Sequence, residues 1–394
     1  MARVTEFRLY AVDLPFGKTF RHAAAERRVS GSLFLRARLD SGAEGWGECL
    51  PRPYVSGESR EGAFALLRDT ILPSLLGQGF KSFAEVISFL EKCDGKAPSA
   101  WIRPAVSQSS AWCCVDLALI DAFAKTFGEA ARLREEGVKA SSVPLEETRY
   151  SGVVSADRGW RYWWSLLKIR AFGFPTVKVK LERNGAPRAA RIARRLLGRR
   201  VELRVDANMA WDVEQALDII GELRTIGIDW FEQPIDAKDL DGLARLVRES
   251  SAGIIVDEGM TDRQSLEALI GRRASTGVNV RISKCGGLVA ANARCRETLD
   301  AGLTLQVGCQ VGESSLLSAA HVRLLSALTR RSPGVRFAEG CFGRHLLRED
   351  PFSPRVQFRY GGRPPILPPG LGLGLQADDA ILERWTVDET RVSS

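Results

Sequence analysis

Long apolar runs are missing from this sequence. No stretch approaches the roughly 20 apolar residues that a helix needs to cross a bilayer, and the first 15 residues alternate like a strand without the apolar core of a secretion signal. CxxC pairs and zinc-like spacings are missing too, because the eight cysteines are scattered along the chain. We therefore expect a cytoplasmic protein with reduced, mostly buried thiols and no membrane partner.

Motifs for binding nucleic acids are also missing, although the chain is basic. Its formal net charge is +8 and its pI is near 9.2, and clustered arginines can neutralise phosphates. In the densest basic run, residues 188–200, apolar residues recur at helical spacing, which predicts that the arginines line the solvated side of a helix. We expect no nucleic-acid partner and infer that the excess charge favours anionic substrates.

The 394 residues are enough for two domains, or for one large barrel with a smaller partner. Residues 1–62 are predicted to form strands and turns, with a hairpin at the D-S-G segment of residues 40–42. Residues 63–137 are predicted to be helical. A Pro- and Gly-rich tail follows residue 360, and its two prolines stand where the strand of a dinucleotide site would be, which argues against a phosphate site.

Between these regions, eight short β-branched strands alternate with helices. This pattern predicts a parallel sheet covered by helices, and eight units in about 220 residues fit a closed (β/α)8 TIM barrel. An open doubly wound sheet is the alternative, but the Gly-rich dinucleotide turn is absent from every strand end. We predict an α/β protein with a β/α barrel over residues 138–360, which follows the strands and helices of residues 1–137. The strands are RYSGVVS, TVKVKL, VELRVDAN, IDWFEQPI, GIIVDEGM, GVNVRIS, LTLQVGC and GVRFAEG.

Three successive strands end in carboxylates, Asp206, Glu232 and Asp257, one β/α unit apart. Neighbouring strands lie about 4.8 Å apart, so acids at equivalent depth converge. Unpaired anions that close repel, and a hard cation with oxygen ligands, Mg²⁺ or Mn²⁺, removes the cost. A single such acid would more often cap the following helix. Three in succession favour a metal site.

Lys178 and Lys180 share one face of the strand before Asp206. If Val177 and Val179 pack outward, both lysines point into the barrel, where a nearby cation would lower their pKa values as a lysine base requires. The alternative, solvated lysines on an edge strand, is disfavoured because a barrel has no edges. On the far side, strand alternation predicts that Arg281 points inward, and Lys284 follows three residues later.

Taken in order, these segments resemble the enolase superfamily, in its muconate-lactonizing and mandelate racemase-like branch. SGAEGWGECLPRPYVSGES resembles the family's capping segment and RYSGVV its first barrel strand. The later strand ends follow as KVK, VDAN, FEQP, VDE, SKCGG, GCQVGESSLLSAA and EGCFG.

The resemblance implies a modified (β/α)8 barrel and an α+β capping domain over its mouth. The capping domain would span residues 1–137 and be completed by residues 361–394. The resemblance also implies a homo-oligomer. It implies Mg²⁺ on Asp206, Glu232 and Asp257, where the ion would bind a substrate carboxylate and stabilise the enediolate formed on α-proton removal. Enolase-superfamily sites pair such an ion with a lysine or histidine base. Lys180 matches the family's usual base, and Lys178 matches the neighbour that lowers its pKa.

One position departs from the family, because Arg281 stands where the opposing catalytic lysine is expected. Arginine stays protonated and is a poor proton acceptor, which puts two-base racemisation or epimerisation in doubt. We predict one-base lyase or cycloisomerase chemistry on a small carboxylate, in which Arg281 stabilises charge or clamps a carboxylate. Alternatives are a racemase or epimerase using Lys180 and Lys284, if a β-bulge turns Lys284 inward, and a catalytically silent barrel that acts as a binding module.

Four further residues are candidates for substrate binding. Asn208 shares the face of Asp206, and Glu313 follows the seventh strand, where complementing a helix dipole is an equally good role. His22 and Tyr54 lie in the expected capping segments, where substrate selection normally resides.

Overall fold

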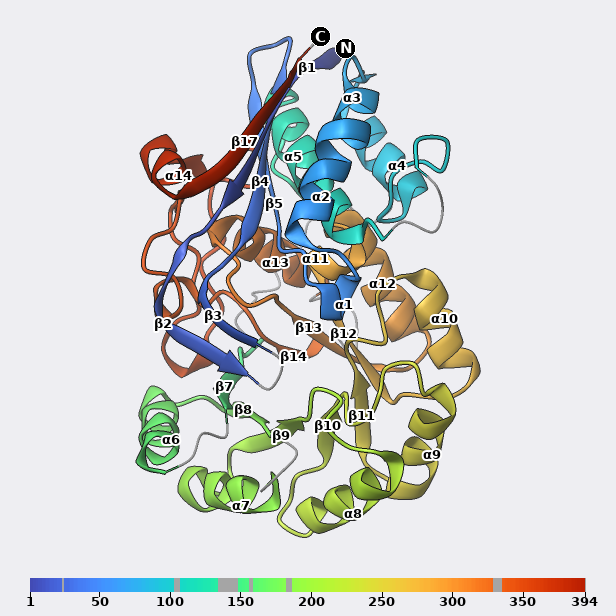
Figure 1. Ribbon diagram of the computed structural model, residues 1–394, viewed down its shortest axis with the longest axis vertical. Coiled ribbons are helices and arrows are strands. Elements are labelled where there is room, and N and C mark those ends of the chain that lie inside the picture. The colour runs from blue at the N-terminus through green and yellow to red at the C-terminus, as the bar shows by residue number, and fades with distance from the viewer. Residues whose placement is uncertain are drawn as a thin grey trace.

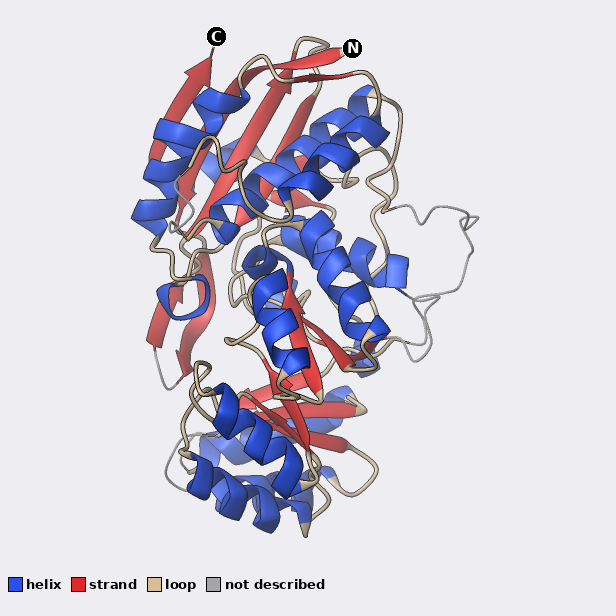
Figure 2. Cartoon of the chain, turned by 90° about the vertical axis from the view of Figure 1, so that its right-hand side faces the viewer, coloured by secondary structure: helices blue, strands red, loops and turns tan. Residues whose placement is uncertain are grey.

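Sheets of five and eight strands organise the described part of the chain, and they are stacked end to end (Figures 1 and 2). The computed structural model describes residues 1–22, 25–102, 107–133, 148–155, 159–181, 186–328 and 335–393, with the backbone alone at residues 18–22, 25, 26 and 186. Both termini lie at the end of the antiparallel sheet that points away from the parallel one (Figure 1). No helix in these ranges is both long and apolar enough to cross a membrane.

The eight-stranded sheet is parallel throughout and runs in sequence order from β7 to β14. An isolated parallel bridge between Tyr150 and Ala338 joins its two outer strands. The predicted modified barrel is therefore confirmed. Its strands are β7 (Gly152–Ser155), β8 (Thr176–Lys180), β9 (Glu202–Asp206), β10 (Trp230–Glu232), β11 (Gly253–Val256), β12 (Gly277–Arg281), β13 (Thr304–Gly308) and β14 (Val335–Ala338).

Helices cover the outside of this sheet, and two of them begin at reciprocal capping boxes. Asp212 accepts a hydrogen bond from the Gln215 backbone N–H, and Asp262 does the same with Ser265. Val177 and Val179 of β8 are fully buried. The helices are α6 (Trp160–Phe172), α7 (Ala186–Leu197), α8 (Val213–Arg224), α9 (Leu240–Ser250), α10 (Arg263–Gly271), α11 (Ile282–Cys285), α12 (Leu288–Asp300) and α13 (Ser315–Leu328).

The antiparallel sheet has the strand order β17-β1-β4-β5, with β6 beside β1. Its predicted hairpin at residues 40–42 joins β4 to β5, with Gly42 at a φ of 83° that favours glycine. The last strand of the chain thus pairs with the first. The strands are β1 (Ala2–Val12), β4 (Ser32–Leu39), β5 (Glu44–Cys49), β6 (Gly79–Phe80) and β17 (Thr386–Ser393).

Helix α5 (Ser109–Thr126) is buried along most of its length against β5. Its backbone comes so close that a Cβ on Gly47 would overlap the Cys114 carbonyl oxygen, and one on Gly45 would overlap the Ala122 nitrogen. The G-W-G segment thus permits the packing. The other helices here are α1 (Pro53–Ser56), α2 (Arg60–Leu66), the π-helical turn η1 (Leu67–Ile71), α3 (Leu72–Leu75) and α4 (Phe83–Cys93).

Buried polar contacts join the antiparallel layer to the barrel. Asp116 of α5 accepts from the Leu288 N–H at 2.6 Å, and Glu48 of β5 accepts from the backbone N–H and hydroxyl of Ser314 at 2.9 and 2.6 Å. These bonds fix the mouth of the barrel beneath the antiparallel layer. The remaining elements are β2 (Pro15–His22), β3 (Ala25–Val29), β15 (Phe352–Ser353), β16 (Gln376–Ala377), α14 (Asp379–Trp385) and the 3-10 turns η3 (Gly343–His345) and η4 (Tyr360–Gly362).

Candidate active site

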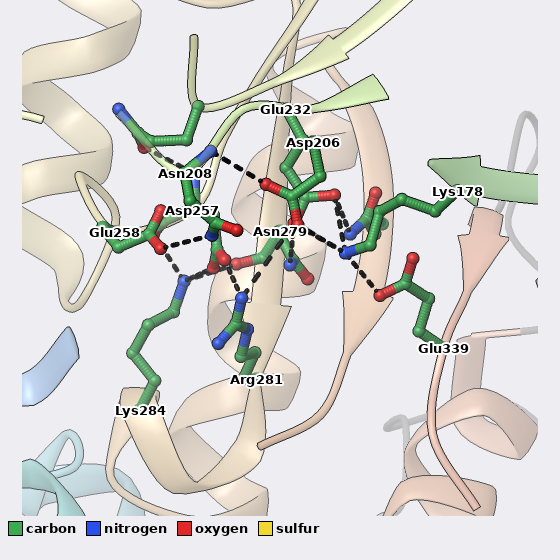
Figure 3. A network of polar contacts seen from close by, with 12 residues as sticks. Lys178, Asp206, Asn208, Glu232, Asp257, Glu258, Asn279, Arg281, Lys284 and Glu339 are labelled. Atoms are coloured by element: carbon green, nitrogen blue, oxygen red, sulfur yellow. Dashed lines mark hydrogen bonds and ion pairs between the residues drawn. The ribbon is translucent and has the colours of Figure 1, made fainter. Parts of the chain in front are cut away.

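Three carboxylates stand at the carboxyl ends of three neighbouring barrel strands. Asp206 pairs in register with Glu232, and Glu232 pairs with Ile255, so Asp257 stands two residues beyond. Because residues two apart in a strand share a face, Asp257 lies on the same face of the sheet as Ile255 and Glu232. Each of the three acids is 1% exposed. Figure 3 shows their side chains within one network of polar contacts.

Lys178 binds several acids of this network at once. Its Nζ donates to the two oxygens of Glu232 at 3.1 and 3.0 Å, and it lies 3.2 Å from Asp206 Oδ2 and 2.7 Å from Glu339 Oε2. Burial lowers the pKa of Lys178, but the surrounding carboxylates, Glu232 foremost, outweigh burial and raise the pKa above its ordinary value. Among these acids alone, Lys178 is therefore held as an ammonium ion, and the lowering expected from a nearby metal cation stays a prediction.

Lys180 reaches a more open place. Its Nζ lies 3.1 Å from Asp206 Oδ2 and donates to Asn208 Oδ1 at 3.2 Å. The side chain of Lys180 is 18% exposed and that of Lys178 is 3% exposed. Burial raises the pKa of Asp206, but Lys180 and then Lys178 lower it well below its usual range. Asp206 is therefore a permanent anion between two amines, and Lys180 is the amine with more room for a ligand.

Arg281 closes the opposite side of the network. Its Nη2 contacts Asp257 Oδ2 and lies 4.0 Å from Glu232 Oε1, and its Nη1 donates to Gln310 Oε1 at 3.2 Å. Strand β12 keeps an unbroken register with β13 and ends at Arg281. The strand therefore carries no bulge that would turn the following residues inward.

Lys284 lies on α11, the single helical turn that follows. Its side chain is fully buried, and its Nζ donates to Asp257 O, Asp257 Oδ1 and Asn279 O at 2.6, 2.8 and 2.7 Å. Burial, and then the charge of Arg281, lower the pKa of Lys284 to about 7. The structure thus places Arg281 at the cavity and Lys284 behind Asp257.

A cavity of about 170 Å³ opens onto this network. Tyr54 of α1 lies over it from the antiparallel layer, and Asn208 and Glu258 line it beside the two lysines and Arg281. Asn208 Nδ2 donates to Glu258 Oε1 at 3.2 Å. Burial, and then the charge of Asp206, raise the pKa of Glu258. Cationic and anionic side chains therefore face the same space.

Two predicted substrate-binding residues are not brought to the cavity by the described contacts. Glu313 is buried and accepts from the Gln310 N–H at 2.6 Å, and burial raises its pKa to about 8. It shapes the turn after β13 and does not line the cavity. The side chain of His22 lies outside the described residues.

Glu339 belongs to the network, although it is not among the site residues predicted from the sequence. It follows β14 directly, contacts Lys178 and Arg204, and lines the cavity. The signal was present, because RFAEG ends a barrel strand in an acid just as the three earlier strands do.

The acids fit a hard divalent cation in donor type. Asp206 Oδ2 and Asp257 Oδ2 are buried and accept no hydrogen bond, although cationic side chains lie close to each. Within the described residues, however, no three acids, histidines or cysteines are grouped closely enough to hold an ion as they stand. Lys178 lies between Asp206 and Glu232, and Arg281 lies between Glu232 and Asp257.

Comparison with known proteins identifies a family and several relatives. Residues 165–381 match the family model described as "Enolase C-terminal domain-like". The chain is 25% identical to an N-succinyl-L-Arg/Lys racemase of Bacillus cereus, with 98% of each chain covered. It is 26% identical to muconate cycloisomerase 1 of Rhodococcus opacus, over 95% of this chain and 96% of that one.

Solved structures share the fold. The crystal structure of a dipeptide epimerase from Cytophaga hutchinsonii, complexed with Mg and the dipeptide D-Ala-L-Val, superposes with a TM-score of 0.84 at 21% identity, over 99% of this chain and 100% of that one. The similar proteins thus include racemases, epimerases and cycloisomerases.

Proposed function

Because the chain belongs to the enolase C-terminal domain-like family of the enolase superfamily, we propose that it is a divalent-metal enzyme that removes the proton next to a carboxylate of a small acid. Lys180 is the base in this proposal. The observation that carries it is that Lys180, which lines the cavity, contacts Asp206, one of three buried acids on successive strand ends directly beneath the residues that line that cavity.

Mg²⁺, or Mn²⁺ in its place, would be held by Asp206, Glu232 and Asp257. When bound, the ion would supply positive charge that acidifies the proton next to a carboxylate. The magnesium named with the Cytophaga structure supports this choice of ion. The bridging cations Lys178 and Arg281 have to give way for the acids to act as ligands.

The division of labour between the lysines follows from their surroundings. Lys178 is enclosed by acids that keep its amine protonated, so it is fit to hold negative charge and unfit to accept a proton. Lys180 contacts one carboxylate and an amide oxygen, and it lines the cavity. A substrate proton held in the cavity lies within reach of its amine.

Arg281 favours chemistry with one base. Its guanidinium cannot be deprotonated in a protein, so across the cavity from Lys180 it supplies a cation and no proton acceptor. Elimination and cycloisomerisation need one base, and Arg281 is suited there to binding a substrate carboxylate. The likeness to muconate cycloisomerase 1 supports this version.

A racemase or epimerase is the second candidate, and the comparisons favour it over the first. Racemases and epimerases are prominent among the similar proteins, including the N-succinyl-L-Arg/Lys racemase and an L-Ala-D/L-Glu epimerase of Bacillus subtilis. A lysine whose pKa is about 7, as for Lys284, also suits a base near neutral pH. Lys284 would have to lose its three hydrogen bonds and become exposed to the cavity before it could act as a base.

The test is α-proton exchange in D₂O with Mg²⁺, using N-succinyl amino acids, dipeptides and muconate as candidate substrates. Exchange or turnover of one of these classes is the expected result. Deuterium uptake with unchanged configuration, or lactone formation, supports one-base chemistry. Inversion of the substrate supports the second candidate. Failure of every class to exchange or turn over would contradict the proposed function.

A further inference from the structure

Both carboxylate oxygens of Asp257 are occupied by cations of the protein itself. Lys284 Nζ lies 2.8 Å from Oδ1, and Arg281 Nη2 contacts Oδ2. Arg281 also lies 4.0 Å from Glu232 Oε1. The guanidinium thus stands between two of the three acids that the proposed function gives to the metal.

Acidic and basic side chains are equal in number in this network. Five acids face five basic side chains, and all ten are buried or nearly so. A divalent cation would add two positive charges beside these basic side chains, and Arg281 cannot lose a proton to reduce the repulsion. The acids are Asp206, Glu232, Asp257, Glu258 and Glu339, and the bases are Lys178, Lys180, Arg204, Arg281 and Lys284.

Arg281 also borders the cavity, which leaves space into which its guanidinium can move. Its side chain is 11% exposed and lines the cavity. Beyond the acids it donates to Gln310 at 3.2 Å, and its Nε is buried without a hydrogen-bond acceptor. Lys284, by contrast, is fixed by three oxygens, two of them backbone carbonyls.

We propose that Arg281 competes with the divalent cation for Asp257 and Glu232, and that metal binding drives its guanidinium off these acids toward the cavity. This inference rests on the proposed function, because it takes the metal site from there. It adds two consequences. Metal affinity is set below what the three acids alone would give, and a metal-loaded site presents a released guanidinium to an anionic ligand.

Metal binding can be measured without any reaction, by titrating the full chain with Mn²⁺ and following free Mn²⁺ by electron paramagnetic resonance. We expect Arg281→Gln to bind Mn²⁺ at least about tenfold more tightly than the native chain, a difference of roughly 1.4 kcal/mol. Arg188→Gln, an exposed change of equal charge on α7, is the matched control and should leave the affinity unchanged.

Arg281→Lys is a second variant in case Arg281→Gln does not fold. It keeps the positive charge but has a shorter side chain, so its contact with Asp257 should be weaker. It should also bind Mn²⁺ more tightly than the native chain, by a smaller factor. A dicarboxylate probe, succinate, should strengthen Mn²⁺ binding by the native chain and have little effect on Arg281→Gln.

Equal or weaker Mn²⁺ binding by both Arg281 variants would overturn the inference. An equal increase in Mn²⁺ affinity in Arg188→Gln would also overturn it, because the change in net charge would then explain the effect. Tighter binding in the Arg281 variants together with an absence of proton exchange would leave the inference standing and count against the proposed reaction. Absence of Mn²⁺ binding in every form would overturn both.

Discussion

Arg281 separates the two reaction types at the level of a single side chain. A guanidinium at the end of β12 supplies charge and no base, whereas a lysine amine there would face Lys180 across the cavity. The sequence was sufficient to place Arg281 at this position by strand alternation. It was not sufficient to exclude Lys284, because two of the three oxygens that hold the Lys284 amine belong to Asp257, on the preceding barrel strand unit.

Replacing Arg281 by lysine should therefore introduce two-base chemistry. With a substrate that the native chain exchanges without inversion, we expect Arg281→Lys to raise the rate of inversion about 10²-fold, the usual contribution of a positioned base. Chiral chromatography of the product measures it. If the native chain already inverts its substrate and the variant does so no faster, Arg281 is not what limits the chemistry.

Among the elements, the contact of β5 with α5 shows why glycine is required in the G-W-G segment. Ala at position 47 would place a Cβ on the Cys114 carbonyl oxygen, and overpacking against backbone has no inexpensive relief. We expect Gly47→Ala to lose about 3 kcal/mol or more of unfolding free energy, measured by urea denaturation.

Gly221, inside helix α8, is the matched control for that substitution. A Cβ there meets nothing within 4 Å, and alanine restricts the unfolded chain, so Gly221→Ala should gain about 0.5–1 kcal/mol. If Gly47→Ala were as stable as the native chain, α5 could shift away from β5 at little cost, which would contradict the close packing of the two backbones.

The barrel strands and their order were predictable from the sequence, because each short β-branched run is followed by an amphipathic helix. The three acids were predictable because they repeat at strand ends. The polar network was not. Glu339 enters it from the last strand, and Gln310 reaches Arg281 from a loop, through contacts that no local pattern encodes. The domain limits at residues 137 and 361 remain predictions.

At the scale of the whole molecule, the antiparallel layer and the barrel are joined through buried acids whose charge is costly. Burial raises the pKa of Asp116 to about 7, although backbone donors of α12 lower it in part. A carboxyl whose pKa is raised on folding binds a proton more tightly in the folded chain. Its stabilisation is complete below pH about 4 and is lost as the pH rises through about 7.

The native chain should therefore lose roughly 2–4 kcal/mol more stability between pH 4 and pH 8 than Asp116→Asn does. The amide keeps an oxygen for the Leu288 N–H and does not ionise. Urea denaturation at each pH gives the comparison, and Asp218→Asn, an exposed change on α8, should follow the native profile. Parallel profiles for the native chain and Asp116→Asn would mean that Asp116 is ionised throughout.

The central claim is that Lys180 takes the proton. The most direct measurement is the rate of deuterium uptake next to the carboxylate of an accepted substrate, followed by NMR in D₂O with Mg²⁺, for the native chain, Lys180→Met and the surface control Lys168→Met on α6. We predict that Lys180→Met loses about 10²–10⁴-fold in exchange while its Mn²⁺ binding persists, and that Lys168→Met exchanges as the native chain does. Exchange at the native rate in Lys180→Met would contradict the assignment of Lys180 as the base.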